Sequence, residues 1–94
     1  MQNNEEIVKY QVKIDSRPSK FLDKLDDYKF YHILEEILNL ETNPRPVGCS
    51  KLNYKDGYRI KWSTYRILFT VDDYRRTVVV YKIAHRKDAY KKKK

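Results

Sequence analysis

The sequence predicts an α+β domain in which a pair of helices packs on one face of a mainly antiparallel sheet of about four strands. Three observations predict it. Residues 8–14 alternate apolar and polar side chains, residues 16–38 repeat their apolar side chains at helical spacing, and residues 58–84 return to a strand-like pattern. The expected order is strand, helix, helix, three strands and a short C-terminal segment, which leaves one face of the sheet without helices.

The first half of the chain contains the predicted first strand and both helices. Asp15-Ser16 provides a helix cap and Pro18 occupies the first turn, where proline is tolerated. The pair Asp26-Asp27 interrupts the helical region, so we expect two helices. Their apolar side chains are Phe21, Leu22, Leu25 and Tyr28 in the first, and Phe30, Ile33, Leu34, Ile37 and Leu38 in the second. Stripes of this kind predict core packing.

A loop separates the helices from the remaining strands. Residues 41–48 contain two prolines, an Asn and a Gly, which end a helix and exclude a central strand. Residues 58–62 and 65–71 alternate, which predicts two strands joined by a tight turn at Ser63-Thr64. Residues 77–84 form an almost unbroken apolar run, which predicts a strand inside the sheet and covered on both faces.

Length and composition indicate one folded domain. Ninety-four residues leave room for a single core, so we expect one domain over residues 1–94 with flexible tails at 1–6 and 91–94. Hydrophobic residues at 40% exclude a disordered chain, and no apolar run is long enough to cross a membrane. Cys49 is the only cysteine, which excludes an internal disulfide. The N-terminus carries acids where a secretory signal needs bases, so we expect a cytoplasmic protein.

Positive charge is concentrated in the second half of the chain. Residues 1–48 carry seven Lys or Arg against nine Asp or Glu, a net charge of −2, whereas residues 49–94 carry fourteen against four, a net charge of +10. A surface that collects this excess attracts polyanions: nucleic acid, an acidic protein segment or anionic lipid. Part of the excess is a terminal run of four lysines. The alternative explanation is therefore that the positive charge only keeps the protein soluble.

Two cations share one face of the strand at residues 58–62. Arg59 and Lys61 alternate with apolar side chains, so they stand on the uncovered face if the apolar side chains cover the helices. The next strand can add Arg66 to the same face. Like charges that are held together repel one another, and phosphate suits the planar guanidinium well. We therefore expect an anion at this face, with ordinary solvent exposure as the alternative.

The segment after the last strand combines three reactive side chains. His85, Arg86 and Tyr90 bring an imidazole, a guanidinium and a phenol, which suffice to neutralise phosphate oxygens and move protons without a metal. In the alternative interpretation Tyr90 caps the core and His85 bonds a backbone carbonyl. His32 lies within the helical stripe and is interpreted as structural. The chain has no Gly-rich phosphate loop and no His-Glu-x-x-His motif, so no metal or cofactor is expected.

Five short motifs in a fixed order resemble a known family. They are Asn43-Pro44-Arg45-Pro46, Ser50-Lys51-Leu52, Gly57-Tyr58-Arg59-Ile60-Lys61, Tyr65-Arg66-Ile67-Leu68-Phe69 and Ala84-His85-Arg86-Lys87-Asp88-Ala89-Tyr90. From about Lys9 to Tyr90 the chain resembles the RelE/ParE superfamily of bacterial and archaeal toxin–antitoxin modules, most closely its RelE branch. The resemblance implies a ribosome-dependent, metal-independent endoribonuclease in which the ribose 2′-hydroxyl attacks the adjacent phosphate.

The resemblance also implies a set of site residues. The catalytic positions are Arg59, Lys61, Arg66, His85, Arg86 and Tyr90, to which we add Lys51, Lys55 and Lys87 as RNA-binding cations. The sequence departs from the family pattern in two places: Arg59 replaces a frequent Lys, and His85 precedes the C-terminal arginine. Because some branches use a histidine as general acid or base, either His85 or Tyr90 can activate the 2′-hydroxyl.

The implied partners are a cognate antitoxin, mRNA in the ribosomal A site and ribosomal RNA. Two alternatives share the fold or the charge. A ParE-like toxin poisons DNA gyrase and needs no cleaving residues, and a simple nucleic-acid-binding protein would show salt-dependent affinity without products.

Overall fold

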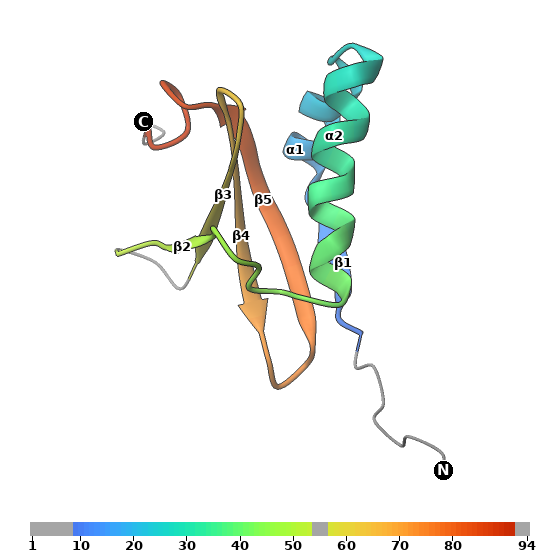
Figure 1. Ribbon diagram of the computed structural model, residues 1–94, viewed down its shortest axis with the longest axis vertical. Coiled ribbons are helices and arrows are strands. Elements are labelled where there is room, and N and C mark those ends of the chain that lie inside the picture. Colours follow the sequence, from blue (N-terminus) through green and yellow to red (C-terminus); the bar gives the residue numbers. More distant parts are fainter. Residues whose placement is uncertain (1–8, 54–56, 92–94) are drawn as a thin grey trace.

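The residues that the computed structural model describes, 9–53 and 57–91, form a five-stranded sheet with a helical layer on one side (Figure 1). The elements are β1 (Gln11–Ile14), α1 (Ser16–Asp23), α2 (Asp27–Leu38), the short 3-10 helix η1 (Asn39–Glu41), β2 (Ser50–Lys51), β3 (Tyr58–Trp62), β4 (Tyr65–Asp72) and β5 (Thr77–His85). The predicted α+β class and the helix pair are confirmed. None of the described helices is long and apolar enough to cross a membrane.

The strand order is β1-β5-β4-β3-β2. Neighbouring strands are antiparallel except β1 and β5, which run parallel. The prediction of about four strands was one too low, because β2 has only two residues, Ser50 and Lys51, and two residues show no alternation. The position of β5 inside the sheet is confirmed. The prediction that both of its faces are covered is wrong, since Val78 and Val80 are buried but Val79 is only half-buried.

The start of α2 follows from its local sequence, whereas Asp15, at the predicted cap of α1, makes no side-chain capping hydrogen bond. The Asp26 carboxylate accepts a hydrogen bond of 3.0 Å from the backbone N–H of Lys29, which caps α2. This cap starts a new helix, so the predicted place of Tyr28 in the first helix is wrong. Tyr28 lies in the first turn of α2 and is 67% exposed.

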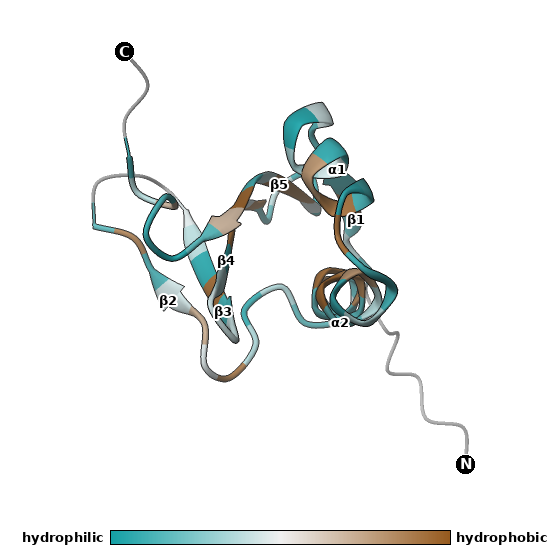
Figure 2. Ribbon diagram, turned by 90° about the horizontal axis from the view of Figure 1, so that it is seen from above, coloured by the Kyte–Doolittle hydropathy of each residue, from teal (hydrophilic) through white to brown (hydrophobic). Residues whose placement is uncertain are grey.

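The main core lies between the helices and the sheet. Ile33, Ile37 and Leu40 contribute the helical side. The fully buried sheet side chains that meet them are Ile67, Phe69, Val78 and Val80. In Figure 2 the hydrophobic side of α2 faces the sheet and its hydrophilic side faces outward.

A second, smaller buried cluster lies on the other face of the sheet. Leu68 and Ala84 point away from the helices but are only 2% and 8% exposed, and Ala89 is 1% exposed. Figure 1 shows the segment after β5 on the side of the sheet opposite the helices. The turn at residues 86–90 therefore covers Leu68 and Ala84, and Ala89 anchors it there. This turn carries Tyr90 to the face without helices.

Candidate functional site

The face of the sheet without helices carries a row of cations, as the alternation predicts. Arg59 and Lys61 lie two residues apart on β3, and Lys61 is the direct cross-strand neighbour of Arg66 on β4. These three side chains therefore share one face. Lys82 on β5 joins them, because it is paired with Leu68, the cross-strand neighbour of Arg59. We call Arg59, Lys61, Arg66 and Lys82 the cationic face.

A β-bulge on β5 explains why Lys82 was missed. Leu68 pairs with Lys82 but the next residue, Phe69, pairs with Val80, so Tyr81 is an extra residue in the strand. One extra residue exchanges the two faces for everything that follows it. Lys82 consequently faces away from the helices and Ile83 faces the core. The apolar run at residues 77–84 contains no alternation that would have revealed this change.

Tyr90 is held against the cationic face by Arg59. The Arg59 Nη1 atom donates a hydrogen bond of 2.8 Å to the Tyr90 phenolic oxygen. The guanidinium carbon lies 5.9 Å from the centre of the Tyr90 ring. Lys82 Nζ also donates a bond of 3.3 Å to the backbone oxygen of Lys91, which helps hold the C-terminal turn in place. The predicted proximity of Arg59 and Tyr90 is thus present in the structure.

The two remaining predicted arginines lie at the end of the sheet beside the β3–β4 turn. Arg66 Nη1 donates to the backbone oxygens of Tyr65, at 2.8 Å, and Ser63, at 3.2 Å. Arg86 donates its backbone N–H to the oxygen of Thr64 at 2.7 Å. Both residues are therefore fixed at the same end of the sheet, where the chain leaves β5 and where the turn joins β3 to β4.

The cationic face is not neutralised by carboxylates of the described part of the chain. The ion pairs found within residues 9–53 and 57–91 join Lys29 to Asp26, Arg45 to Asp73, Arg75 to Asp72 and Lys91 to Asp88. None of them includes a residue of the cationic face or Arg86. The Nε atom of Arg59 is buried without a hydrogen-bond partner among the same residues. The cationic face and Arg86 therefore carry positive charge that no carboxylate of the described residues balances.

His85 lies on the opposite face of the sheet from the cations. It pairs with Tyr65, whose side chain is buried on the helix side, and the two ring centres are 4.6 Å apart. The predicted grouping of His85 with Arg59 and Tyr90 is therefore not present. The bulge at Tyr81 again gives the reason, because it turns the last residues of β5 over.

The three predicted RNA-binding lysines are not gathered in one place. Lys51 Nζ lies 5.3 Å from the ring centre of Tyr58, which points to the helix side of β3. Lys87 is exposed in the C-terminal turn. Lys55 lies outside the described residues, as do the predicted tail at 1–6 and residues 92–94 of the predicted tail at 91–94.

A hydrogen-bonded clasp closes the other end of the sheet. The Asp73 carboxylate accepts bonds from Arg45 Nη1 and Nη2, at 3.1 and 2.8 Å, and from the Tyr10 hydroxyl at 2.7 Å. Arg45 Nε also donates to the Tyr58 oxygen at 2.9 Å. The Arg45 guanidinium and the Tyr10 hydroxyl hold the pKa of Asp73 below its usual value. The clasp ties the loop after η1 to β1, β3 and the β4–β5 turn.

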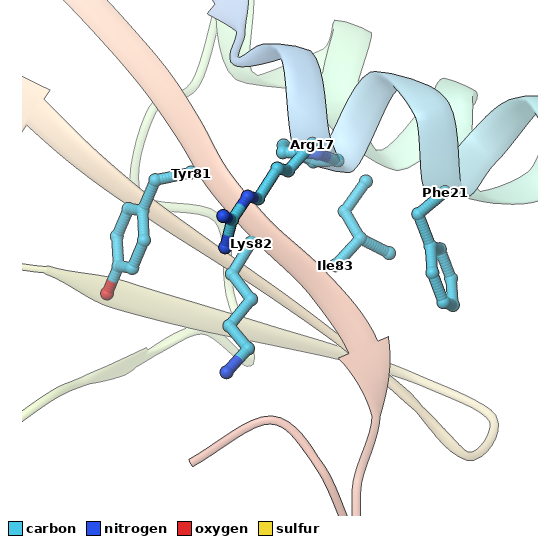
Figure 3. Close-up of a pocket in the computed structure, with 6 residues that line it drawn as sticks. Arg17, Phe21, Tyr81, Lys82 and Ile83 are labelled. Carbon is cyan, nitrogen blue, oxygen red and sulfur yellow. The ribbon is translucent and has the colours of Figure 1, made fainter. Parts of the chain in front are cut away.

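A pocket of about 340 Å³ lies between α1 and β5. Figure 3 shows Arg17 and Phe21 reaching it from α1, and Tyr81, Lys82 and Ile83 from β5. Two of the lining side chains, Arg17 and Lys82, are cationic, and Lys82 also belongs to the cationic face. Within residues 9–53 and 57–91, no group of three or more His, Cys, Asp or Glu side chains could hold a metal ion.

A family model and the folds of solved structures identify this chain, with its helix pair on one face of a mixed sheet, as a toxin of the RelE/ParE superfamily. Residues 5–90 match the family model described as ParE toxin of type II toxin–antitoxin system, parDE, and the chain belongs to this family. Comparison with curated proteins gives no match.

Solved structures of RelE toxins share the fold. The RelBE2 toxin–antitoxin complex of Mycobacterium tuberculosis has 25% sequence identity and a TM-score of 0.73, over 90% of this chain and all of that one. The archaeal RelE–RelB complex of Pyrococcus horikoshii OT3 has 25% identity and a TM-score of 0.73, over 86% and 99%. The E. coli RelBE complex, at 23% identity and a TM-score of 0.71 over 81% and 95%, shows the same fold.

Proposed function

We propose that this toxin is a metal-independent endoribonuclease that cleaves mRNA in the ribosomal A site. The observation that carries the proposal is the contact between Arg59 and Tyr90 on the cationic face, where the neighbouring cations have no carboxylate partner in the described part of the chain. A phosphate on this face would meet cations from β3, β4 and β5 and a phenol from the C-terminal turn.

The reaction is an attack of the ribose 2′-oxygen on the adjacent phosphorus. The new bond joins the 2′-oxygen to phosphorus, the bond from phosphorus to the 5′-oxygen breaks, and a 2′,3′-cyclic phosphate and a 5′-hydroxyl are formed. In its phenolate form Tyr90 takes the proton of the 2′-hydroxyl and becomes the neutral phenol; Tyr90 is assigned this role because its oxygen lies on the cationic face and the His85 ring lies on the other side. The Arg59 guanidinium stabilises negative charge that develops beside it.

The other cations stabilise the transition state. Arg66 and Arg86 lie at the same edge of the sheet and offset the extra charge on the phosphorane. Lys61 stands opposite Arg66, holds a flanking phosphate and assists protonation of the leaving oxygen. Removal of one such donor elsewhere costs about 10²- to 10³-fold in kcat.

The proposed protein partner is a cognate antitoxin. The RelE toxins of M. tuberculosis and P. horikoshii were solved in complexes with their antitoxins. An antitoxin segment that carries acidic side chains and folds on binding would neutralise the cationic face. The proposed nucleic-acid partners are A-site mRNA and ribosomal RNA.

A second candidate function is supported by the family model itself, which is that of ParE toxins. A ParE-like toxin would poison DNA gyrase, and the cationic face would serve binding alone. Induction of the toxin in cells separates the two candidates. A ribonuclease degrades translated mRNA within minutes, whereas a gyrase poison causes DNA damage while transcripts stay intact.

The direct experiment is primer extension on a translated message, with and without ribosomes, using toxin purified away from its antitoxin. We expect discrete cuts only with ribosomes, and a loss of about 10²- to 10³-fold for Arg66→Ala and for Arg86→Ala. Arg75→Ala is the matched control, because Arg75 is an exposed cation at the β4–β5 turn that pairs with Asp72. Full activity of folded Arg66→Ala and Arg86→Ala would contradict the proposal.

A further inference from the structure

A row of aromatic rings crosses the end of the sheet on its helix side. The Trp62 ring stacks on His32 at 5.0 Å and on Tyr65 at 6.2 Å, each with an interplanar angle of 18°. Tyr65 is followed by His85, at 4.6 Å and 35°. The four rings come from α2, β3, β4 and β5 in turn. Tyr65 is 4% exposed, so the middle of the row is fixed by the core.

The row ends in an exposed imidazole. His85 is the last residue of β5 and is exposed, and within residues 9–53 and 57–91 its ring contacts only that of Tyr65. No ion pair or side-chain hydrogen bond is found for it among these residues. The imidazole therefore lies tilted against the buried Tyr65 ring, at an interplanar angle of 35°, and His85 remains exposed to solvent.

The exposed ring is directly next to an arginine of the proposed phosphate site. Arg86 follows His85, and its backbone N–H is fixed to Thr64 at 2.7 Å. Consecutive Cα atoms are about 3.8 Å apart, so the two side chains leave the backbone at the same end of the sheet. A strand of RNA whose phosphate binds Arg86 therefore has a base within reach of the His85 ring.

We infer that His85 is a base-stacking residue, which extends the row His32, Trp62, Tyr65 and His85 by one unpaired nucleobase of the mRNA next to the cleaved linkage. The inference rests on the proposed ribonuclease function and assigns His85 a role in substrate binding. Bases of single-stranded RNA stack on aromatic side chains irrespective of their sequence, because every base has a flat π-face. A ring that is already packed loses little freedom when the base binds.

Two substitutions of His85 distinguish stacking from proton transfer. His85→Phe keeps a flat ring and removes both nitrogens, whereas His85→Ala removes the ring. The readout is kcat/KM for cleavage of ribosome-bound mRNA over a range of pH. We expect His85→Phe to stay within about threefold of the wild type with an unchanged pH profile, and His85→Ala to fall by about 5- to 100-fold.

Removal of the base tests the contact from the other side. The substrates are mRNAs with one abasic nucleotide, placed in turn on each side of the cleaved linkage. On one of these mRNAs we expect the wild type and His85→Ala to react at the same rate, because the base that stacks on His85 is missing. Tyr74→Ala is the control, since Tyr74 is 94% exposed in the β4–β5 turn at the far end of β5. It should behave as the wild type on every mRNA.

The possible outcomes separate this inference from the function on which it rests. Absence of ribosome-dependent cleavage by the wild type would remove the proposed function itself. If the wild type cleaves but His85→Phe and His85→Ala lose activity equally, or neither loses any, base stacking is overturned. Loss of one limb of the pH profile in His85→Phe would also overturn it and would make His85 a general acid or base.

Discussion

Arg59 and Tyr90 are thirty-one positions apart in the chain, yet the Arg59 guanidinium donates a 2.8 Å hydrogen bond to the Tyr90 phenol. The contact depends on two separate features of the fold. Strand alternation turns Arg59 away from the helices, and the buried Ala89 anchors the C-terminal turn on the same face. A cation of the sheet and a phenol of the tail are thereby held at one point before any ligand binds.

The contact predicts energetic coupling in catalysis. Arg59→Ala and Tyr90→Phe each lower kcat by about 10²- to 10³-fold in our proposal, since each removes one member of the pair. Because the two groups act together, the double variant should be far less impaired than the product of the single effects. The measurement is a double-mutant cycle on the rate of cleavage of ribosome-bound mRNA.

Lys61→Ala provides the comparison for this cycle. Lys61 lies on the same face, but the structure shows no contact between it and Tyr90 within the described residues. Its effect should therefore multiply with that of Tyr90→Phe. Equal coupling of Tyr90 to Lys61 and to Arg59 would show that the hydrogen bond seen here has no special part in the reaction.

The buried position of Ala89 predicts that activity is sensitive to a larger side chain there. Ala89→Leu adds three carbon atoms beneath the C-terminal turn, and overpacking of this kind costs about 1–3 kcal/mol. The turn should shift and separate Tyr90 from Arg59, so cleavage falls while the sheet and helices remain folded. Circular dichroism and the cleavage assay report the two effects.

Lys91→Leu is the matched control for Ala89→Leu. It adds leucine two residues further along, at a side chain that is 72% exposed. Activity should change little. If Ala89→Leu stays fully active, the placement of Tyr90 by the buried Ala89 is wrong.

The clasp at Asp73 predicts a stability that depends on pH. The pKa of the Asp73 carboxyl is lowered in the folded protein by the hydrogen bonds from Arg45 and Tyr10. As the pH falls, the unfolded chain therefore binds a proton at Asp73 before the folded protein does. The contribution of Asp73 is therefore complete above its unfolded pKa of about 4 and is lost as the pH falls through the folded value. The free energy of urea unfolding, measured from pH 7 to pH 2, should differ between wild type and Asp73→Asn only at the higher pH values.

Added salt and a second variant test the origin of this effect. Because the Arg45 and Asp73 side chains are 40% and 57% exposed, salt should reduce the difference between wild type and Asp73→Asn. Asp23→Asn, in the last turn of α1, shows the effect of removing a carboxylate elsewhere. A difference that persists unchanged at pH 2 would contradict an ionic contribution.

The sequence was sufficient to predict most of the fold because its periodicities are local. The stripe from Phe30 to Ile37 and the alternation at residues 58–62 each depend on the spacing of neighbours alone, although Leu38, which was predicted to belong to the stripe, is 47% exposed. The grouping of Arg59, Lys61 and Arg66 followed from that alternation and from one tight turn. The two-residue strand β2 escaped prediction because its pairing with β3 depends on tertiary contact.

The faces of the last strand could not be predicted in the same way. The extra residue Tyr81 reverses the orientation of everything after it, which brings Lys82 to the cationic face and takes His85 away from it. A bulge in an apolar run leaves no mark in the sequence pattern. The residue type of His85 suggested a general acid or base. The face of the sheet to which His85 points depends on the cross-strand register, which the residue type does not reveal.

The last turn of α2 offers a test of the core with two adjacent residues. Ile37 is fully buried between the helices and the sheet, whereas its neighbour Leu38 is 47% exposed. Ile37→Ala should lower the free energy of unfolding by about 2–5 kcal/mol, because it removes buried methyl groups and leaves a cavity. Leu38→Ala should change it by less than about 1 kcal/mol, since little of its side chain leaves a packed site. Ile37→Ala gains slightly more helix propensity than Leu38→Ala, which acts against the expected difference, so urea unfolding of the two variants gives a lower bound on the difference in packing. Equal losses would mean that α2 does not pack on the sheet through the face that contains Ile37.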